Sequence, residues 1–423
     1  MRPRFALSLG SAAFAGMVIA AAAQVPRGFT GSFDDPAIQY AKGPRSDAGL
    51  DLNRRLESGR LRLTFEKGSG YLRSVLDALD VPVDSQVAVY AQDSFQAALI
   101  NRRNPRTIYF NDHVAVGWVR GGDIEIAAQD PRQAIEFYVL EHQETAAPRL
   151  RRETAACLRC HVSWDTLGVP GEMVQSVGPP DAAGYASGGV TDHRTPIAER
   201  WGGWFVTGDP NGMTHMGNVP VDVAESRRPV HPVVLHSLEG QFDLTGYLSP
   251  HSDIVALMVL EHQTHMMNLL SYIGWEARVH ADAATIREIA HGVVDYMLFV
   301  DEARLNGPIA GSSGFSRRFA SLGPKDHRGR SLRELDLRHR LMTYPCSYMI
   351  YAPVFDALPA PAKSAIYERL WEVLSGKATG AKYRRLSPAD RRAIVEILRD
   401  TKKDLPAYFE QPADTPGLSR ETR

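Results

Sequence analysis

The sequence predicts an α+β protein with an N-terminal mixed α/β sheet domain, an irregular middle segment and a mainly α-helical C-terminal region. Three observations support this fold class. Short alternating runs are concentrated before residue 150, glycine and proline are frequent at 153–232, and apolar residues recur at helical spacing from Ser252 onward. The 423 residues carry 48 basic and 49 acidic side chains, so the formal charge of −1 gives no general attraction to nucleic acid.

The N-terminus has the pattern of an export signal. Arg2 and Arg4 form a short basic region, and an apolar run and three alanines follow before Gln24. We therefore expect residues 1–23 to be a signal peptide and the mature protein to be soluble in the periplasm, with an uncleaved N-terminal anchor as the alternative. No later apolar run has membrane-spanning length, and residues 24–49 are expected to form an irregular leader.

Residues 50–150 are expected to form a small α+β domain with a largely antiparallel sheet. A helix is predicted at 71–79, because its leucines and valine fall on one helical face. Strands are predicted in runs that alternate in polarity or are rich in β-branched and aromatic residues, namely 61–65, 87–90, 107–110, 114–119 and 124–128.

The most specific motif, Cys157-Leu158-Arg159-Cys160-His161, lies in the middle segment, 151–235. C-x-x-C-H is the attachment signature of c-type haem, because each thiol can add to one vinyl group and the adjacent imidazole can bind the iron. A redox dithiol and half a zinc site are the alternatives, but the sequence has neither a flanking βαβ pattern nor a second ligand pair. The motif predicts one covalently attached haem c, on which an otherwise irregular segment can pack.

A second axial ligand would decide the chemistry of such a haem. A thioether ligand suits electron transfer, whereas an empty position permits binding of small molecules or peroxide. The glycine-flanked loop 212–218 offers Met216 as first candidate, His215 as second and Met213 as third. His193 is another candidate, and the alternative for the methionines is packing against the haem edge.

Three further residues are predicted to contact the cofactor. Arg194, next to Asp192, is a candidate partner for a haem propionate, because guanidinium binds carboxylates in two-pronged geometry. Trp201 and Trp204 are candidate aromatic walls of the haem pocket, with ordinary core packing as the alternative. Trp164, three residues after the motif, is a candidate shield of the proximal side.

Residues 250–405 are expected to form a helical domain, followed by a polar tail at 406–423. Helices are predicted at 254–277, 283–300, 331–340, 361–374 and 388–402. Within the first of these, Glu261, His262 and His265 can share a helical face, either to hold a metal ion or as hydrogen-bonded imidazoles of the core or haem pocket. Cys346 has no partner cysteine and is expected to be a buried thiol.

Several stretches resemble uncharacterised bacterial proteins that contain a cytochrome c domain with one C-x-x-C-H motif. They are residues 157–177, 191–218, 344–348 and 370–374. The resemblance implies an exported monohaem protein and carries over the roles of Cys157, Cys160 and His161. It implies no particular reaction, and the flanking regions are larger than those of a simple class I cytochrome.

Two functions follow from these observations. The first is a monohaem c-type cytochrome that passes single electrons to an unknown periplasmic redox partner. The second is a haem oxidoreductase, peroxidase-like or oxidising a small molecule, with an open distal site. The long chain favours the second, since electron transfer alone needs little scaffold. A gas or redox sensor is a third interpretation, but no signalling domain follows the motif.

Overall fold

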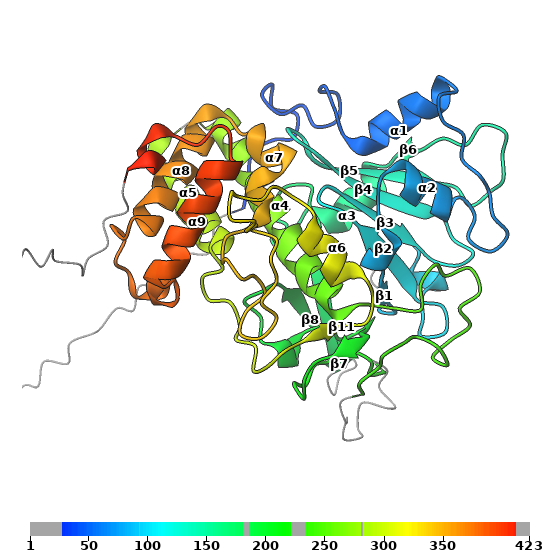
Figure 1. Ribbon diagram of the computed structural model, residues 1–423. Helices are drawn as coiled ribbons and strands as arrows, with labels where there is room; N and C mark the ends of the chain where they lie inside the picture. The colour runs from blue at the N-terminus through cyan, green and yellow to red at the C-terminus, as the bar shows by residue number, and fades with distance from the viewer. Residues whose placement is uncertain (1–27, 93, 181–185, 221–232, 281, 412–423) are drawn as a thin grey trace, which may run out of the picture.

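The computed structural model describes residues 28–92, 94–180, 186–220, 233–280 and 282–411, and the expected signal peptide 1–23 lies outside them (Figure 1). The predicted α+β class is confirmed: a seven-stranded antiparallel sheet is combined with helices that lie mostly in the C-terminal half. Within the described ranges, no helix is both long enough and apolar enough to cross a membrane.

The main sheet has the strand order β6-β5-β4-β3-β2-β1-β9, and every neighbouring pair is antiparallel. Tight turns connect its central strands; between β2 and β3, for example, Asn111 Oδ1 accepts the backbone N–H groups of His113 and Val114. The strands are β1 Val87–Val89, β2 Arg106–Phe110, β3 Val114–Trp118, β4 Ile124–Asp130, β5 Ala134–Leu140, β6 Arg151–Arg152 and β9 Trp204–Phe205.

The two faces of this sheet pack against different helices. Side chains alternate between faces along a strand, so Tyr109, Val116 and Ile126 share one face. That face packs beneath α1 (Ala48–Glu57) and α2 (Leu72–Ala78), as Figure 1 shows. The opposite face belongs to a larger core, which continues into the C-terminal helices.

Helix α4 (Ile254–Val279) runs between the sheet and the C-terminal helices (Figure 1). Asp253 caps it by accepting the N–H groups of Val255 and Ala256, and nearly all of its side chains are buried. A helix that is buried on all sides is a central element of a protein core. The other C-terminal helices are α5 Ala283–Met297, α6 Phe315–Ser321, α7 Pro353–Asp356, α8 Ala360–Leu374 and α9 Pro388–Thr401.

The middle segment contains more regular structure than its composition indicates. After the short helix α3 (Ala155–His161), strand β7 (Val174–Pro180) pairs with β8 (Ala186–Thr191) in a hairpin. A second small sheet joins β10 (Gly208–Asp209) to β11 (Ala310–Gly311). The expectation of an irregular segment therefore holds only for the connections between these elements.

Two predicted elements are wrong. Residues 61–65 form no strand, because the side chains of Leu61, Leu63 and Phe65 pack against the core without any partner strand. Residues 331–340 form turns, and Leu337 has a φ of +56°, which a helix does not accommodate. Conversely, β5 and α6 were not predicted.

The hairpin β7–β8 is held to the sheet through Gly202, whose carbonyl accepts the N–H of Val177 at 2.9 Å. A Cβ at position 202 would overlap the backbone of Val177. We expect Gly202→Ala to lower the free energy of unfolding by about 1–3 kcal/mol, as overpacking generally does. The matched control is Gly189→Ala, because a Cβ there meets no atom within 4 Å. Urea unfolding measures both, and equal stability of the two variants would contradict the prediction.

Candidate functional site

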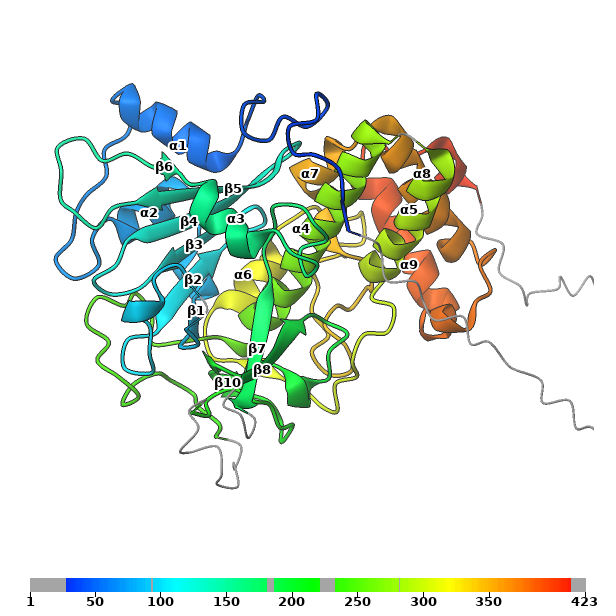
Figure 2. The ribbon, with the colours of Figure 1, turned by 180° about the vertical axis from the view of Figure 1, so that it is seen from behind.

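The Cys157–His161 motif forms helix α3, which lies beside the sheet on the side of α4 (Figure 2). Glu153 Oε1 caps the helix by accepting the N–H groups of Ala155 and Ala156 at 3.1 and 3.0 Å. Residues three apart share a helical face, so both thiols lie on the same side of α3. Cys157 is half-buried against the core, Cys160 is exposed, and both are free thiols.

The imidazole of His161 is held in one orientation and one protonation state. Its Nδ1 lies 2.7 Å from the carbonyl oxygen of Gly171. A carbonyl only accepts hydrogen bonds, so Nδ1 carries the proton and Nε2 keeps a lone pair. Burial lowers the pKa of His161, which keeps the ring neutral, and the ring packs on Phe137 with centroids 4.6 Å apart. This is the arrangement that a metal-binding histidine generally has.

An ion pair on the sheet lies next to the motif. Arg106 on β2 and Glu125 on β4 meet across Gly117 on β3, where any Cβ would collide with the guanidinium. Burial, followed by the charge of Glu125, raises the pKa of Cys157 to about 11, and Arg106 opposes this shift. These residues could not be predicted from the sequence, because only the strand register brings them together.

The same sheet face carries apolar side chains that are only partly buried. Val89, Ile108 and Ala127 lie on this face with Arg106 and Glu125, and Cys157 and Leu158 of α3 pack against the same core. The site therefore combines two free thiols, an imidazole with an available Nε2, apolar side chains and a cation. This donor set fits a c-type haem, which needs two thioether links and one axial nitrogen.

The predicted distal candidates all take part in hydrogen bonds within the protein. Met216 Sδ lies 3.7 Å from Ser176 Oγ on β7, and Met213 Sδ accepts the N–H of Asn306 at 3.4 Å. His215 Nδ1 accepts the N–H of Gly217 at 3.1 Å, and burial lowers the pKa of His215 to about 4. Among the described residues, no hydrogen bond or ring contact joins this loop to His161. Their role as iron ligands stays a prediction.

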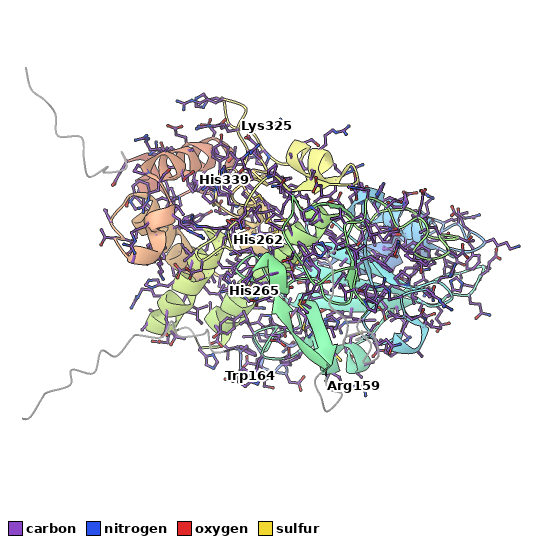
Figure 3. All side chains as sticks on the ribbon, turned by 90° about the horizontal axis from the view of Figure 1, so that it is seen from below. Arg159, Trp164, His262, His265, Lys325 and His339 are labelled. Atoms are coloured by element: carbon purple, nitrogen blue, oxygen red, sulfur yellow. The ribbon has the colours of Figure 1, made fainter. Side chains whose placement is uncertain are left out.

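The residues predicted to contact the haem lie in two different parts of the structure. Trp204 pairs with Val89 in the sheet and donates its Nε1 hydrogen to the carbonyl of Gln175 on β7 at 2.7 Å. Trp201 is fully buried, with a φ of +70°, and packs edge-on against His215 with ring centroids 5.4 Å apart. Trp164 is 80 % exposed, so too little of it is packed to shield His161 (Figure 3).

Arg194 belongs to a different group, and lies at the edge of a cluster of histidines in the core, with its side chain 45 % exposed. It pairs with Asp192 at 2.5 Å, and its guanidinium lies 5.0 Å from the ring centre of Tyr296. His265 Nε2 is 3.4 Å from Arg194 Nη2, and His265 Nδ1 is buried without a hydrogen-bond partner. The predicted partnership of Arg194 with a haem propionate would therefore compete with Asp192.

The centre of this cluster is a chain of hydrogen bonds. His193 Nδ1 lies 2.9 Å from His262 Nδ1, and His262 Nε2 lies 2.8 Å from Ser347 Oγ. The His262 ring stacks on Phe299 with centroids 4.3 Å apart, and burial lowers its pKa to about 3. His262 is thus one of the hydrogen-bonded core imidazoles that were expected as the alternative to a metal site.

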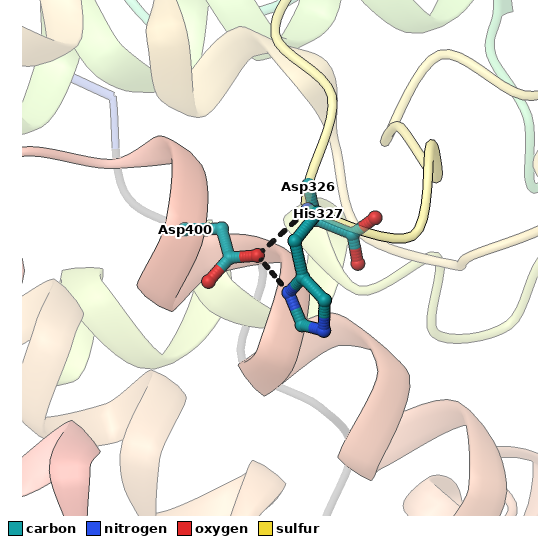
Figure 4. Close-up of side chains that lie close together, drawn as sticks. All are labelled: Asp326, His327 and Asp400. Carbon is teal, nitrogen blue, oxygen red and sulfur yellow. Dashed lines mark hydrogen bonds and ion pairs between the residues drawn. The ribbon is translucent and has the colours of Figure 1, made fainter.

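One group of metal-ligand type occurs in the described part of the chain, Asp326, His327 and Asp400 (Figure 4). Its atoms already have partners: Asp326 accepts from Arg330 Nε and from two backbone N–H groups, and His327 Nδ1 bonds Asp400. The arrangement is that of a surface ion-pair network. Asp400 lies on α9, and Asp326 and His327 lie in the loop that follows α6, apart from α3.

No protein-family model matches this chain, and neither a curated protein nor a solved structure was found to match it. The resemblance to cytochrome c domain proteins therefore stays a prediction. The candidate site is defined by its own geometry, which centres on Cys157, Cys160 and His161.

The buried histidines predict acid sensitivity of the fold. Burial, with help from Arg194 and against Asp192, lowers the pKa of His265 from 6.5 to about 4. Between these values the unfolded chain binds a proton at His265 that the folded chain excludes, so the contribution of His265 to stability falls as pH decreases from 6.5 to 4. We expect His265→Gln to reduce this loss by roughly 3 kcal/mol, measured by urea unfolding at pH 7, 5.5 and 4. An identical pH dependence in the variant would count against a neutral His265.

Proposed function

We propose that this protein is an exported monohaem c-type cytochrome that exchanges single electrons with a periplasmic redox partner. The observation that carries the proposal is the motif helix, where two free thiols share a face and His161 Nε2 keeps its lone pair. The export pattern at residues 1–23 supports it, because haem is attached to such motifs outside the cytoplasmic membrane in bacteria.

Each residue has a distinct part in this proposal. Cys157 and Cys160 would hold the porphyrin edge by thioether bonds, and His161 Nε2 would be the proximal ligand. The Gly171 carbonyl keeps the proton on Nδ1, which orients the ring. Arg106 is a cation on this face, and it would exchange Glu125 for a carboxylate of the cofactor. When bound, the haem supplies a centre that accepts and releases one electron.

The exposure of the motif supports electron transfer between proteins. Cys160 and Arg159 are exposed, and Figure 3 shows Arg159 and Trp164 at the periphery of the molecule, with His262 and His265 in its interior. A cofactor edge at the surface can approach a partner closely, and an exposed tryptophan beside it gives that partner an apolar contact.

A specific observation favours the second candidate function, a haem oxidoreductase with an open distal site. Met213 and Met216 each accept or share a hydrogen bond through sulfur, and His215 accepts one through Nδ1. If all three keep these partners, loop 212–218 supplies no sixth ligand. An open position would then be available to a small molecule or peroxide.

Covalent attachment tests the proposal directly. Maturation in a host with a haem-ligation pathway should give red protein whose mass includes one haem, because both thiols of the motif are free. Cys157→Ala and Cys160→Ala should each lose one thioether and shift the ferrous absorption band. The matched control is Cys346→Ala, which should keep the haem, because Cys346 lies in the core. Colourless parent protein with free thiols at 157 and 160 would overturn the proposal.

Ligand binding separates the two candidate functions. A carrier whose sixth position is filled should take up carbon monoxide or cyanide slowly, whereas an open site should bind them at once. Spectra of ferric and ferrous protein, with and without these ligands, measure the difference. Met216→Ala and His215→Ala, made separately, should change the spectrum if either residue binds iron. An unchanged spectrum in both variants would exclude these two residues as ligands.

A further inference from the structure

A cavity of about 780 Å³ lies at the C-terminal end of α5, on a part of the molecule distinct from α3. Its walls come from residues 298–307, from residues 336–345 and from Arg385 and Leu386 ahead of α9. We propose that this cavity binds a small organic dianion with an apolar body, such as an aromatic dicarboxylate. The proposal is independent of the haem, and rests on the charge, availability and shape of the lining residues.

The cavity is lined by more cations than anions. Four arginines face it, against the two carboxylates of Glu302 and Asp336, which leaves an excess of two positive charges. The arginines are Arg304, Arg338, Arg340 and Arg385. A concave surface with one predominant charge concentrates counter-ions, so this cavity attracts anions.

Two of these guanidinium groups are available to a ligand. Arg340 is engaged with Asp390 at 2.8 Å, and Arg385 donates to the carbonyl of Glu302. Within the described ranges, the side chains of Arg304 and Arg338 form no hydrogen bond or ion pair with the protein, and both are exposed. Two unpaired guanidinium groups beside one cavity suit a ligand with two anionic groups, because each can bind a carboxylate in two-pronged geometry.

The carboxylates of the cavity do not neutralise these two arginines. Glu302 Oε1 accepts the N–H of Leu341 at 2.7 Å, and burial raises the pKa of Glu302 to about 7. Asp336 Oδ1 accepts the N–H of Arg338 at 3.1 Å, and its Oδ2 faces His339 and Arg340. Both acids are therefore committed to the backbone and to neighbours in the loop.

Most of the remaining wall is apolar. Its apolar residues are Leu298, Phe299, Leu305, Pro345 and Leu386, and Asn306, Gly307 and His339 complete the lining. The Phe299 ring is held against His262, nearly parallel to it at 15°, and its backbone has a φ of +54°. Asp301 and Leu337 also have φ near +60°, so three residues around this cavity adopt a conformation that non-glycine residues rarely adopt. Such strained positions cluster at ligand-binding sites, and the volume is in the range of small-molecule sites.

The test uses the full mature protein and phthalate as the probe, titrated by isothermal calorimetry. We expect saturable binding of one phthalate, whereas 1,2-benzenedimethanol, which has the same ring without charge, should not bind. Arg304→Gln and Arg338→Gln should each weaken phthalate binding about tenfold, because each removes a charge-assisted hydrogen bond. The matched control is Arg287→Gln on the exposed side of α5, which should bind like the parent.

Two outcomes would overturn the proposal. One is the absence of saturable phthalate binding by folded protein, checked by circular dichroism. The other is binding that both cavity variants retain at parent affinity. A third phthalate titration, on Arg338→Lys, distinguishes the loss of a binding charge from misfolding. This variant keeps the positive charge, so it should recover part of the affinity that Arg338→Gln loses. Failure of haem attachment would leave these results unaffected, since none of the lining residues belongs to α3.

Discussion

The arrangement of the core depends on one buried ion pair. Glu261 lies in the N-terminal third of α4 with no exposed surface, and its carboxylate is bound by Arg200 at 3.0 Å and by Thr191 at 2.6 Å. An unpaired charge at this depth would be strongly destabilising, so the partners must stay in place. Arg200 also donates to the carbonyls of His193 and Thr195. Thr191 thereby ties hairpin β7–β8 to the central helix through Glu261, and the Arg200 guanidinium ties the following loop to the same carboxylate.

Much of the fold could be predicted from the sequence, because local patterns and packing agree over long stretches. Helices α4, α5, α8 and α9 and strands β1 to β4 lie where periodicity places them. Strand β5 was not predicted, because it is buried on both faces and its sequence does not alternate in polarity. Its one acidic residue, Glu136, is paired with Arg152. Residues 61–65 do alternate in polarity, but their apolar side chains pack against the core and the segment does not pair in a sheet.

The candidate site was predictable only in part, for a related physical reason. The predicted haem-attachment motif lies within five consecutive residues, so Cys157, Cys160 and His161 can be recognised by their spacing alone. Arg106, Phe137 and Gly171 are brought to the motif by strand register and by a turn, which are properties of the folded chain. Arg194 shows the opposite case. It is close to the predicted haem segment in sequence, but in the folded protein its side chain is paired with Asp192.

The burial of Cys346 has a consequence for the order of events during biogenesis. In an unfolded chain all three thiols are open to an oxidant, whereas the packed core encloses this one completely and raises its pKa to about 12. A wrong cross-link to either motif thiol is therefore confined to the interval before the C-terminal helices assemble. Rapid assembly of those helices would keep the two remaining sulfur atoms unblocked for whatever chemistry they are to undergo.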